Sequence, residues 1–91
     1  MDLQELRLQI DSVDEELIKL FQKRLELSAE VAKYKQKHAM PVYDPVREKE
    51  ILNKLSCKVS KEHETSITAL YSLLFELSRA EQERIINTEV L

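Results

Sequence analysis

Apolar residues recur along the first 34 residues of the chain at alternating steps of three and four positions. The stripe consists of Leu3, Leu6, Ile10, Val13, Leu17, Leu20, Leu27, Val31 and Tyr34. This heptad spacing places the apolar side chains on one face of a helix and is typical of helices that pair with another helix. It predicts one helix from Leu3 to His38. Met40 and Pro41 stop the helix there, because the residue before a proline resists the helical backbone conformation.

Two shorter helices are predicted to follow the long one. Asp44 and Pro45 have the residue types of a helix N-cap and of the first helical position. The apolar positions of the second helix are Ile51, Leu52, Leu55 and Val59. A polar stretch with a candidate N-cap at Ser60 leads to a third helix, whose inner face holds Ile67, Leu70, Leu73, Leu74, Leu77 and Ile85. The pattern therefore predicts an all-α fold of three helices, forming a single domain over residues 1–91.

The predicted first helix is too long for a compact monomer. About 36 residues at ~1.5 Å per residue give a rod of ~54 Å. A compact chain of this length has a radius of gyration of ~12 Å and a diameter of about 30 Å. The protruding part must bury its apolar stripe against another surface, and a second copy of the chain is the simplest partner. We therefore expect a homodimer.

Composition narrows the class of protein. The chain has no glycine and two prolines, which disfavours a small β fold with tight turns. Its net charge of −3 disfavours nucleic-acid binding. No apolar run reaches the roughly 18 residues of a membrane span, and the N-terminus lacks the features of a signal peptide. One cysteine, Cys57, cannot form an internal disulfide, which fits a cytoplasmic location. His38 and His63 lack partners at metal-ligand spacing, so we expect no metal site.

A basic residue interrupts the first apolar stripe. Arg24 stands where leucine or isoleucine is expected. Lys35 follows eleven residues later, so it projects within about 20° of the same direction, ~16 Å further along the helix. Taken alone, the pair is explained by ion pairing across a helix interface, which is the simpler interpretation.

Polar residues also edge the apolar faces of the other two predicted helices. The second helix begins with Asp44, Arg47 and Glu48, and the third carries Ser78 and Gln82 one turn apart. Taken separately, the first group is explained as a helix cap with surface charges, and the second as the polar boundary of an apolar stripe. Together with the basic pair of the first helix they describe an enclosed anion site, and its arginines suit carboxylates.

These residues and their spacing resemble the all-helical chorismate mutase family over about residues 3–85. The matching features are Arg7 in Leu6–Asp11, Arg24 in Lys23–Leu27, Lys35 in Ala32–Lys35, the segment Pro41–Glu48, and Ser78 with Gln82. The resemblance implies an intertwined dimer of three-helix chains whose long first helices pair. It also implies an isomerase, in a stand-alone monofunctional form, that converts chorismate to prephenate for the synthesis of phenylalanine and tyrosine.

The resemblance assigns the catalytic roles. The reaction is a [3,3] rearrangement that moves no proton and uses no nucleophile, metal or cofactor. The site must hold the chair-like conformer of chorismate and stabilise charge on its ether oxygen. By the family pattern, Arg24 and Arg7 of the partner subunit clamp the two carboxylates. Lys35 and Gln82 donate to the ether oxygen, and Glu48 binds the ring hydroxyl.

Five further residues complete the implied substrate site. They are Asp44, whose neighbouring backbone binds the hydroxyl; Arg47 and Ser78, around the ring and its carboxylate; and Val31 and Ile51, as apolar wall. Arg7 lies 17 residues before Arg24, hence roughly 25 Å away along the helix. One small substrate cannot contact both on the same chain, so we expect each site to be shared between two chains.

Two alternatives remain open at this point. An isochorismate pyruvate lyase of the same fold shares the clamp and the helix lysine but is expected to lack the Arg47–Glu48 pair, and assays with each substrate separate the two enzymes. A non-catalytic helical dimer that binds other proteins is the second alternative. It predicts no affinity for small dicarboxylates and gives no reason for Arg24 in the stripe. Arg79 receives no role from the sequence.

Overall fold

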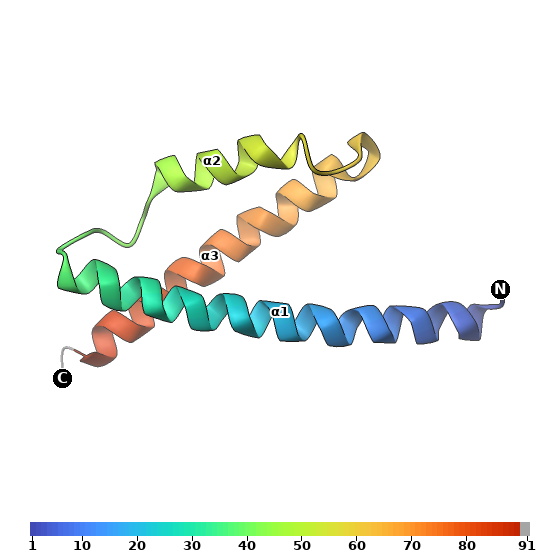
Figure 1. Ribbon diagram of the computed structural model, residues 1–91, viewed down its shortest axis with the longest axis horizontal. Helices are drawn as coiled ribbons and strands as arrows, with labels where there is room; N and C mark the ends of the chain where they lie inside the picture. The colour runs from blue at the N-terminus through green and yellow to red at the C-terminus, as the bar shows by residue number, and fades with distance from the viewer. Residues whose placement is uncertain (90–91) are drawn as a thin grey trace.

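The computed structural model describes residues 1–89, and this part of the chain contains helices and no strand. The elements are α1 (Leu3–Lys37), α2 (Pro45–Leu55), a single 3-10 turn η1 (Lys61–His63) and α3 (Glu64–Glu89). The predicted all-α fold with a very long first helix is thus confirmed. In Figure 1, α1 is one long rod, α3 crosses it near its C-terminal end, and α2 lies beside α3.

Aspartates start both α1 and α2. The Asp2 side chain accepts a hydrogen bond from the backbone N–H of Glu5 at 2.8 Å. The Asp44 side chain accepts one from the N–H of Arg47 at 3.0 Å, with Pro45 at the first helical position. Each cap satisfies an N–H that has no partner inside its helix. The predicted start of α2 is correct to the residue.

The end of α1 depends on a left-handed turn at Ala39, which the sequence pattern does not predict. Ala39 has a φ of 53°, in the left-handed region that usually holds glycine. This turn lets the N–H of Met40 donate to the carbonyl of Lys35 at 2.8 Å. The helix ends at Lys37, one residue before the predicted His38 and ahead of Met40 and Pro41.

The N-terminal part of α1 extends away from the rest of the chain (Figure 1). Residues 1–20 are all exposed, and stripe residues such as Val13 and Leu20 are 62% and 66% exposed. The chain measures 54 Å along its longest axis and has a radius of gyration of 16.5 Å, against ~12 Å for a compact chain. Its surface of 7418 Å² exceeds by about 1,900 Å² what a compact monomer of this mass exposes.

The core that one chain can build is small. Among the described residues the buried apolar side chains are Ala32, Leu55 and Phe75. Ala32 is fully buried on the face of α1 that meets α3. The predicted inner face of α3 is only partly covered, since Ile67, Leu74 and Ile85 are half-buried and Leu70, Leu73 and Leu77 are exposed. Nowhere in residues 1–89 is a helix both long and apolar enough to cross a membrane.

Candidate active site

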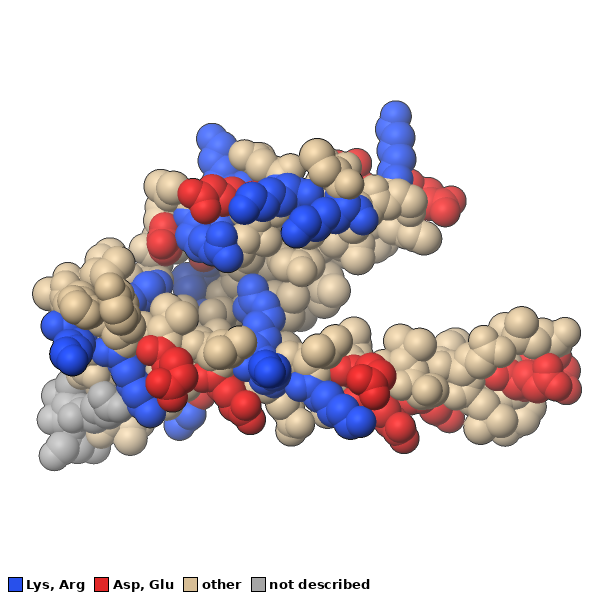
Figure 2. All heavy atoms as spheres, in the orientation of Figure 1, with Lys and Arg blue, Asp and Glu red and all other residues tan. Residues whose placement is uncertain are grey.

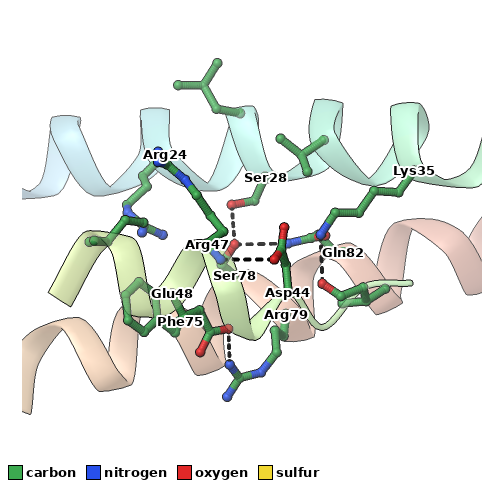
Figure 3. Close-up of a pocket in the computed structure, with 14 residues that line it drawn as sticks. Arg24, Ser28, Lys35, Asp44, Arg47, Glu48, Phe75, Ser78, Arg79 and Gln82 are labelled. Atoms are coloured by element: carbon green, nitrogen blue, oxygen red, sulfur yellow. Dashed lines mark hydrogen bonds and ion pairs between the residues drawn. The ribbon is translucent and has the colours of Figure 1, made fainter. Parts of the chain in front are cut away.

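A cavity of about 370 Å³ lies between the C-terminal half of α1, the start of α2 and the second half of α3 (Figure 3). Nine of the ten residues predicted for the substrate site line it. They are Arg24, Val31, Lys35, Asp44, Arg47, Glu48, Ile51, Ser78 and Gln82. The fold therefore brings side chains from three separate segments to one place.

Lys35 is a buried cation at one end of the cavity, with 8% of its surface exposed. Its Nζ donates to the carbonyl of Val42 at 2.7 Å and to Oε1 of Gln82 at 3.0 Å. An ammonium group has three donors. Two hold the group in place from the α1–α2 connection and from α3, and the third has no acceptor within the described residues 1–89.

The contact with Lys35 fixes the orientation of the Gln82 amide. An ammonium only donates, so the amide oxygen must face Lys35 and the amide nitrogen must face the other way. Nε2 donates to Oγ of Ser78 at 3.2 Å, and this hydroxyl lies 2.8 Å from Oγ of Ser28. Within residues 1–89 the second hydrogen of Nε2 has no acceptor, and Figure 3 shows Gln82 next to Lys35 at the same end of the cavity.

Ser28 has no predicted role, yet the structure buries it in this network with 6% exposed surface. It lies one turn after Arg24 and seven residues before Lys35, which puts all three on one face of α1. That spacing is visible in the sequence. What the sequence does not show is that Ser78 of α3 lies directly opposite.

A second polar group lies at the start of α2. Glu48 forms an ion pair with Arg79 of α3 through Oε2, and the two side chains are 22% and 29% exposed. The guanidinium of Arg79 lies over the ring of Tyr43, 5.3 Å from its centroid. The hydrogen bond to Glu48 raises the pKa of Arg79, so the guanidinium stays charged. Arg79 lines the cavity and is the principal residue that the sequence left without a role.

Cations outnumber acids around the cavity. Four basic residues line it, Arg24, Lys35, Arg47 and Arg79, against two acids, Asp44 and Glu48. Figure 2 shows Lys and Arg side chains gathered where α2 faces α1, whereas the protruding end of α1 presents mainly uncharged and acidic residues. A half-enclosed site with a positive balance suits a ligand with two negative charges.

The walls between these groups are apolar. Val31 and Ile51 line the cavity, and Leu27, Val42 and Phe75 add to them. Phe75 is the most buried of these, at 6% exposed. The sequence places Phe75 one turn before Arg79 on α3, but nothing in its pattern marks it as a cavity residue.

Arg7 is the one predicted site residue that the structure does not bring to the cavity. It lies on the exposed N-terminal part of α1, and it does not line the pocket. Its predicted action in the site of a partner subunit stays a prediction.

The chain is similar to known proteins over most of its length. The model of the family chorismate mutase type II matches residues 6–83. A chorismate mutase of Methanocaldococcus jannaschii is 33% identical over 87 residues, covering 92% of this chain and 87% of that protein. The T-protein of Haemophilus influenzae is 56% identical over 46 residues, which are 50% of this chain and 12% of the T-protein.

A solved structure has the same fold. It is a conserved hypothetical protein from Pyrococcus furiosus, which superposes with a TM-score of 0.73 at 30% identity and covers 88% of this chain and 93% of its own. The family model spans the part of the chain that carries the cavity, from Arg24 to Gln82. The chain belongs to the chorismate mutase type II family.

Proposed function

We propose that this chain is a chorismate mutase that rearranges chorismate to prephenate. The observation that carries the proposal is the pair of donors on Lys35 and Gln82, at one end of a cationic cavity, that have no acceptor in the described part of the chain. The reaction breaks the ether C–O bond of chorismate while a C–C bond forms, and negative charge grows on the ether oxygen. Fixed donors aimed at that oxygen stabilise the transition state more than the ground state.

The other residues of the cavity hold the reactive conformer. Arg24 and Arg47 face the carboxylates, for which the forked guanidinium is well suited. Glu48 and the backbone at Asp44 receive the ring hydroxyl, and Ser78 supports the ring carboxylate. Val31 and Ile51 exclude water from the ring. Holding the two reacting carbons together in this way removes an entropy cost from the rearrangement.

We also propose that the active unit is an intertwined homodimer with shared sites. The exposed stripe of α1 and the half-covered face of α3 support it, since Leu17, Leu20 and Phe21 line one apolar groove with Leu73 and Leu77. The surface excess of about 1,900 Å² per chain is of the size that obligate dimers bury. Arg7 of the partner subunit would then complete the carboxylate clamp.

The biological setting follows from the product. Prephenate is a precursor of phenylalanine and tyrosine, so we propose a place in aromatic amino acid synthesis. The exposed thiol of Cys57 suits the reducing cytoplasm.

The direct test is the loss of chorismate absorbance when purified protein is added. The proposal requires a decay that scales with protein concentration and yields prephenate. In parallel, isochorismate is supplied and pyruvate is measured, because a lyase of this fold would release pyruvate. Pyruvate release without prephenate formation would assign the chain to the lyase, and no turnover of either compound would favour a non-catalytic dimer.

A further inference from the structure

The Glu48 carboxylate is bound on one side and open on the other. Arg79 donates to Oε2, and within residues 1–89 no donor of the chain binds Oε1. Both side chains line the cavity and are less than one-third exposed. Oε1 is therefore the carboxylate oxygen left open to a ligand, and Figure 3 shows the carboxylate held beside Arg79.

Three separate elements hold this carboxylate in place. Glu48 belongs to the first turn of α2, Arg79 to α3, and Tyr43 to the connection between α1 and α2. The Tyr43 ring supports one face of the guanidinium at 5.3 Å, and Glu48 binds its edge. A cation on an aromatic face is attracted by the ring. The position of Arg79 is thus fixed from two directions, and it limits the rotamers of Glu48.

The ion pair with Arg79 also changes how strongly Glu48 binds a charged donor relative to a neutral one. A lone carboxylate attracts an ammonium more strongly than a hydroxyl, because the ammonium carries a full charge. With Arg79 beside Oε2 much of that attraction is cancelled, and the guanidinium repels a second cation. A neutral hydroxyl keeps its hydrogen bond to Oε1 and meets no repulsion.

Building on the proposed function, we propose that Arg79 is a positioning residue that orients Glu48 and makes the hydroxyl subsite select a neutral hydroxyl over an ammonium. In the proposed function, the ring hydroxyl of chorismate occupies this subsite. Its analogue with an amino group there, 4-amino-4-deoxychorismate, presents an ammonium near neutral pH. The two compounds are otherwise alike, so the ratio of their kcat/KM values reports on this subsite.

The test compares Arg79→Met, which removes the charge and the donors, with Arg79→Lys, which keeps the charge. We expect Arg79→Met to shift the kcat/KM ratio toward the amino compound by about tenfold, the effect of one partly screened charge at short range. Arg79→Lys should keep the wild-type ratio while chorismate turnover falls a few-fold, since an ammonium cannot hold the carboxylate as a planar fork does.

The chain provides a matched control on the same helix. Arg84 pairs with Glu81 at the surface of α3 and does not line the cavity. Arg84→Met should leave both the ratio and the turnover of chorismate unchanged. A ratio that moves equally in Arg84→Met and Arg79→Met would overturn the proposal, because the cause would then be a general change of α3.

A double mutant tests whether Arg79 acts through Glu48. In a Glu48→Gln background, Arg79→Met should reduce chorismate kcat/KM much less than it does in the wild type. Fully additive losses, or a ratio within twofold of wild type in Arg79→Met, would overturn the inference alone. Where turnover is absent, calorimetry gives the ratio of the two binding affinities in place of the kcat/KM ratio. Binding of neither compound to the wild type would instead overturn the proposed function and this inference with it.

Discussion

The two halves of α1 have the same apolar spacing, but the C-terminal half packs against the chain and the N-terminal half is exposed. The C-terminal half buries Ser28, Ala32 and Lys35, two of which are polar. The N-terminal half exposes every one of its leucine, isoleucine and valine side chains. The difference lies in what covers each half: α3 crosses the C-terminal half, whereas no other helix among residues 1–89 covers the N-terminal half (Figure 1). A periodic stripe thus predicts a helix face but not the partner of that face.

The covered half can bury polar groups because each of them is hydrogen-bonded. The Lys35 ammonium would be costly to bury alone, but the Val42 carbonyl and the Gln82 amide oxygen both accept from it. The exposed half has the opposite cost, an apolar surface left in water. We infer that the C-terminal half supplies the site of its own chain, and that the N-terminal half serves assembly and, through Arg7, the site of the partner subunit.

The largest expected effect is on the covered half. Lys35→Ala removes the cation that donates to the ether oxygen, so we expect turnover to fall by about 10²–10³-fold. Steady-state kinetics on chorismate measure this, and circular dichroism checks that the helices persist. Lys33→Ala is the matched control, because Lys33 is exposed on the same helix and pairs with Glu30 at 3.5 Å. Activity near wild type in Lys35→Ala would remove this residue from the site.

The second prediction concerns the exposed half and its proposed partner. If Arg7 serves the site of the other chain, Arg7→Ala and Arg24→Ala damage each site from different chains. Mixing the two inactive proteins under conditions of subunit exchange then gives heterodimers with one doubly damaged site and one intact site. With random pairing, activity should recover to about one quarter of wild type, as two-fold symmetry requires.

The same experiment also has an outcome that would reject the shared site. A site confined to one chain predicts no recovery, since every chain carries a defect. Exchange is verified independently by native mass spectrometry of size-tagged chains. Proven exchange without recovery would reject the shared site, whether or not the chain is a chorismate mutase.

The third prediction tests the α3 side of the covered half. Gln82 can donate from Nε2 at any moderate pH, but a carboxyl at this position donates only while protonated. Gln82→Glu should therefore be most active in acid and lose activity as pH rises, by up to tenfold per pH unit. The neighbouring Lys35 ammonium favours ionisation of the introduced carboxyl, which places this loss at low pH. A pH–rate profile parallel to wild type would show that Gln82 does not donate to the substrate.

Much of the site could be predicted because helical periodicity fixes the direction of a side chain. Arg24 and Lys35 are eleven residues apart, and Ser78 and Gln82 four, so each pair must share a face. Asp44 before Pro45 fixes the start of α2, and hence the position of Glu48 one turn inside it. Such local rules need no knowledge of the tertiary fold.

The missed features depend on how the elements meet. The interaction of Arg79 with Tyr43 and Glu48 requires the path of the α1–α2 connection and the crossing of α3, and neither leaves a pattern in the sequence. Ser28 has the right spacing, but its burial depends on Ser78 of another helix. The left-handed backbone of Ala39 breaks the usual preference for glycine, and a chain with no glycine gives no signal for such a turn.

The smallest expected effect lies where α1 turns back toward its own cavity. Ala39 has a left-handed backbone conformation, in which its Cβ is crowded against the main chain. Glycine has no Cβ and adopts this conformation without that steric cost. Glycine loses more entropy on folding, which offsets part of the gain, so Ala39→Gly should raise the free energy of unfolding by about 0.5–1 kcal/mol. Ala80→Gly is the control, because this exposed position inside α3 should lose about 1 kcal/mol. Urea unfolding at equal protein concentration compares the two, since a dimer's stability depends on concentration. If both variants were destabilised alike, the left-handed backbone at Ala39 would not be a source of strain at the end of α1.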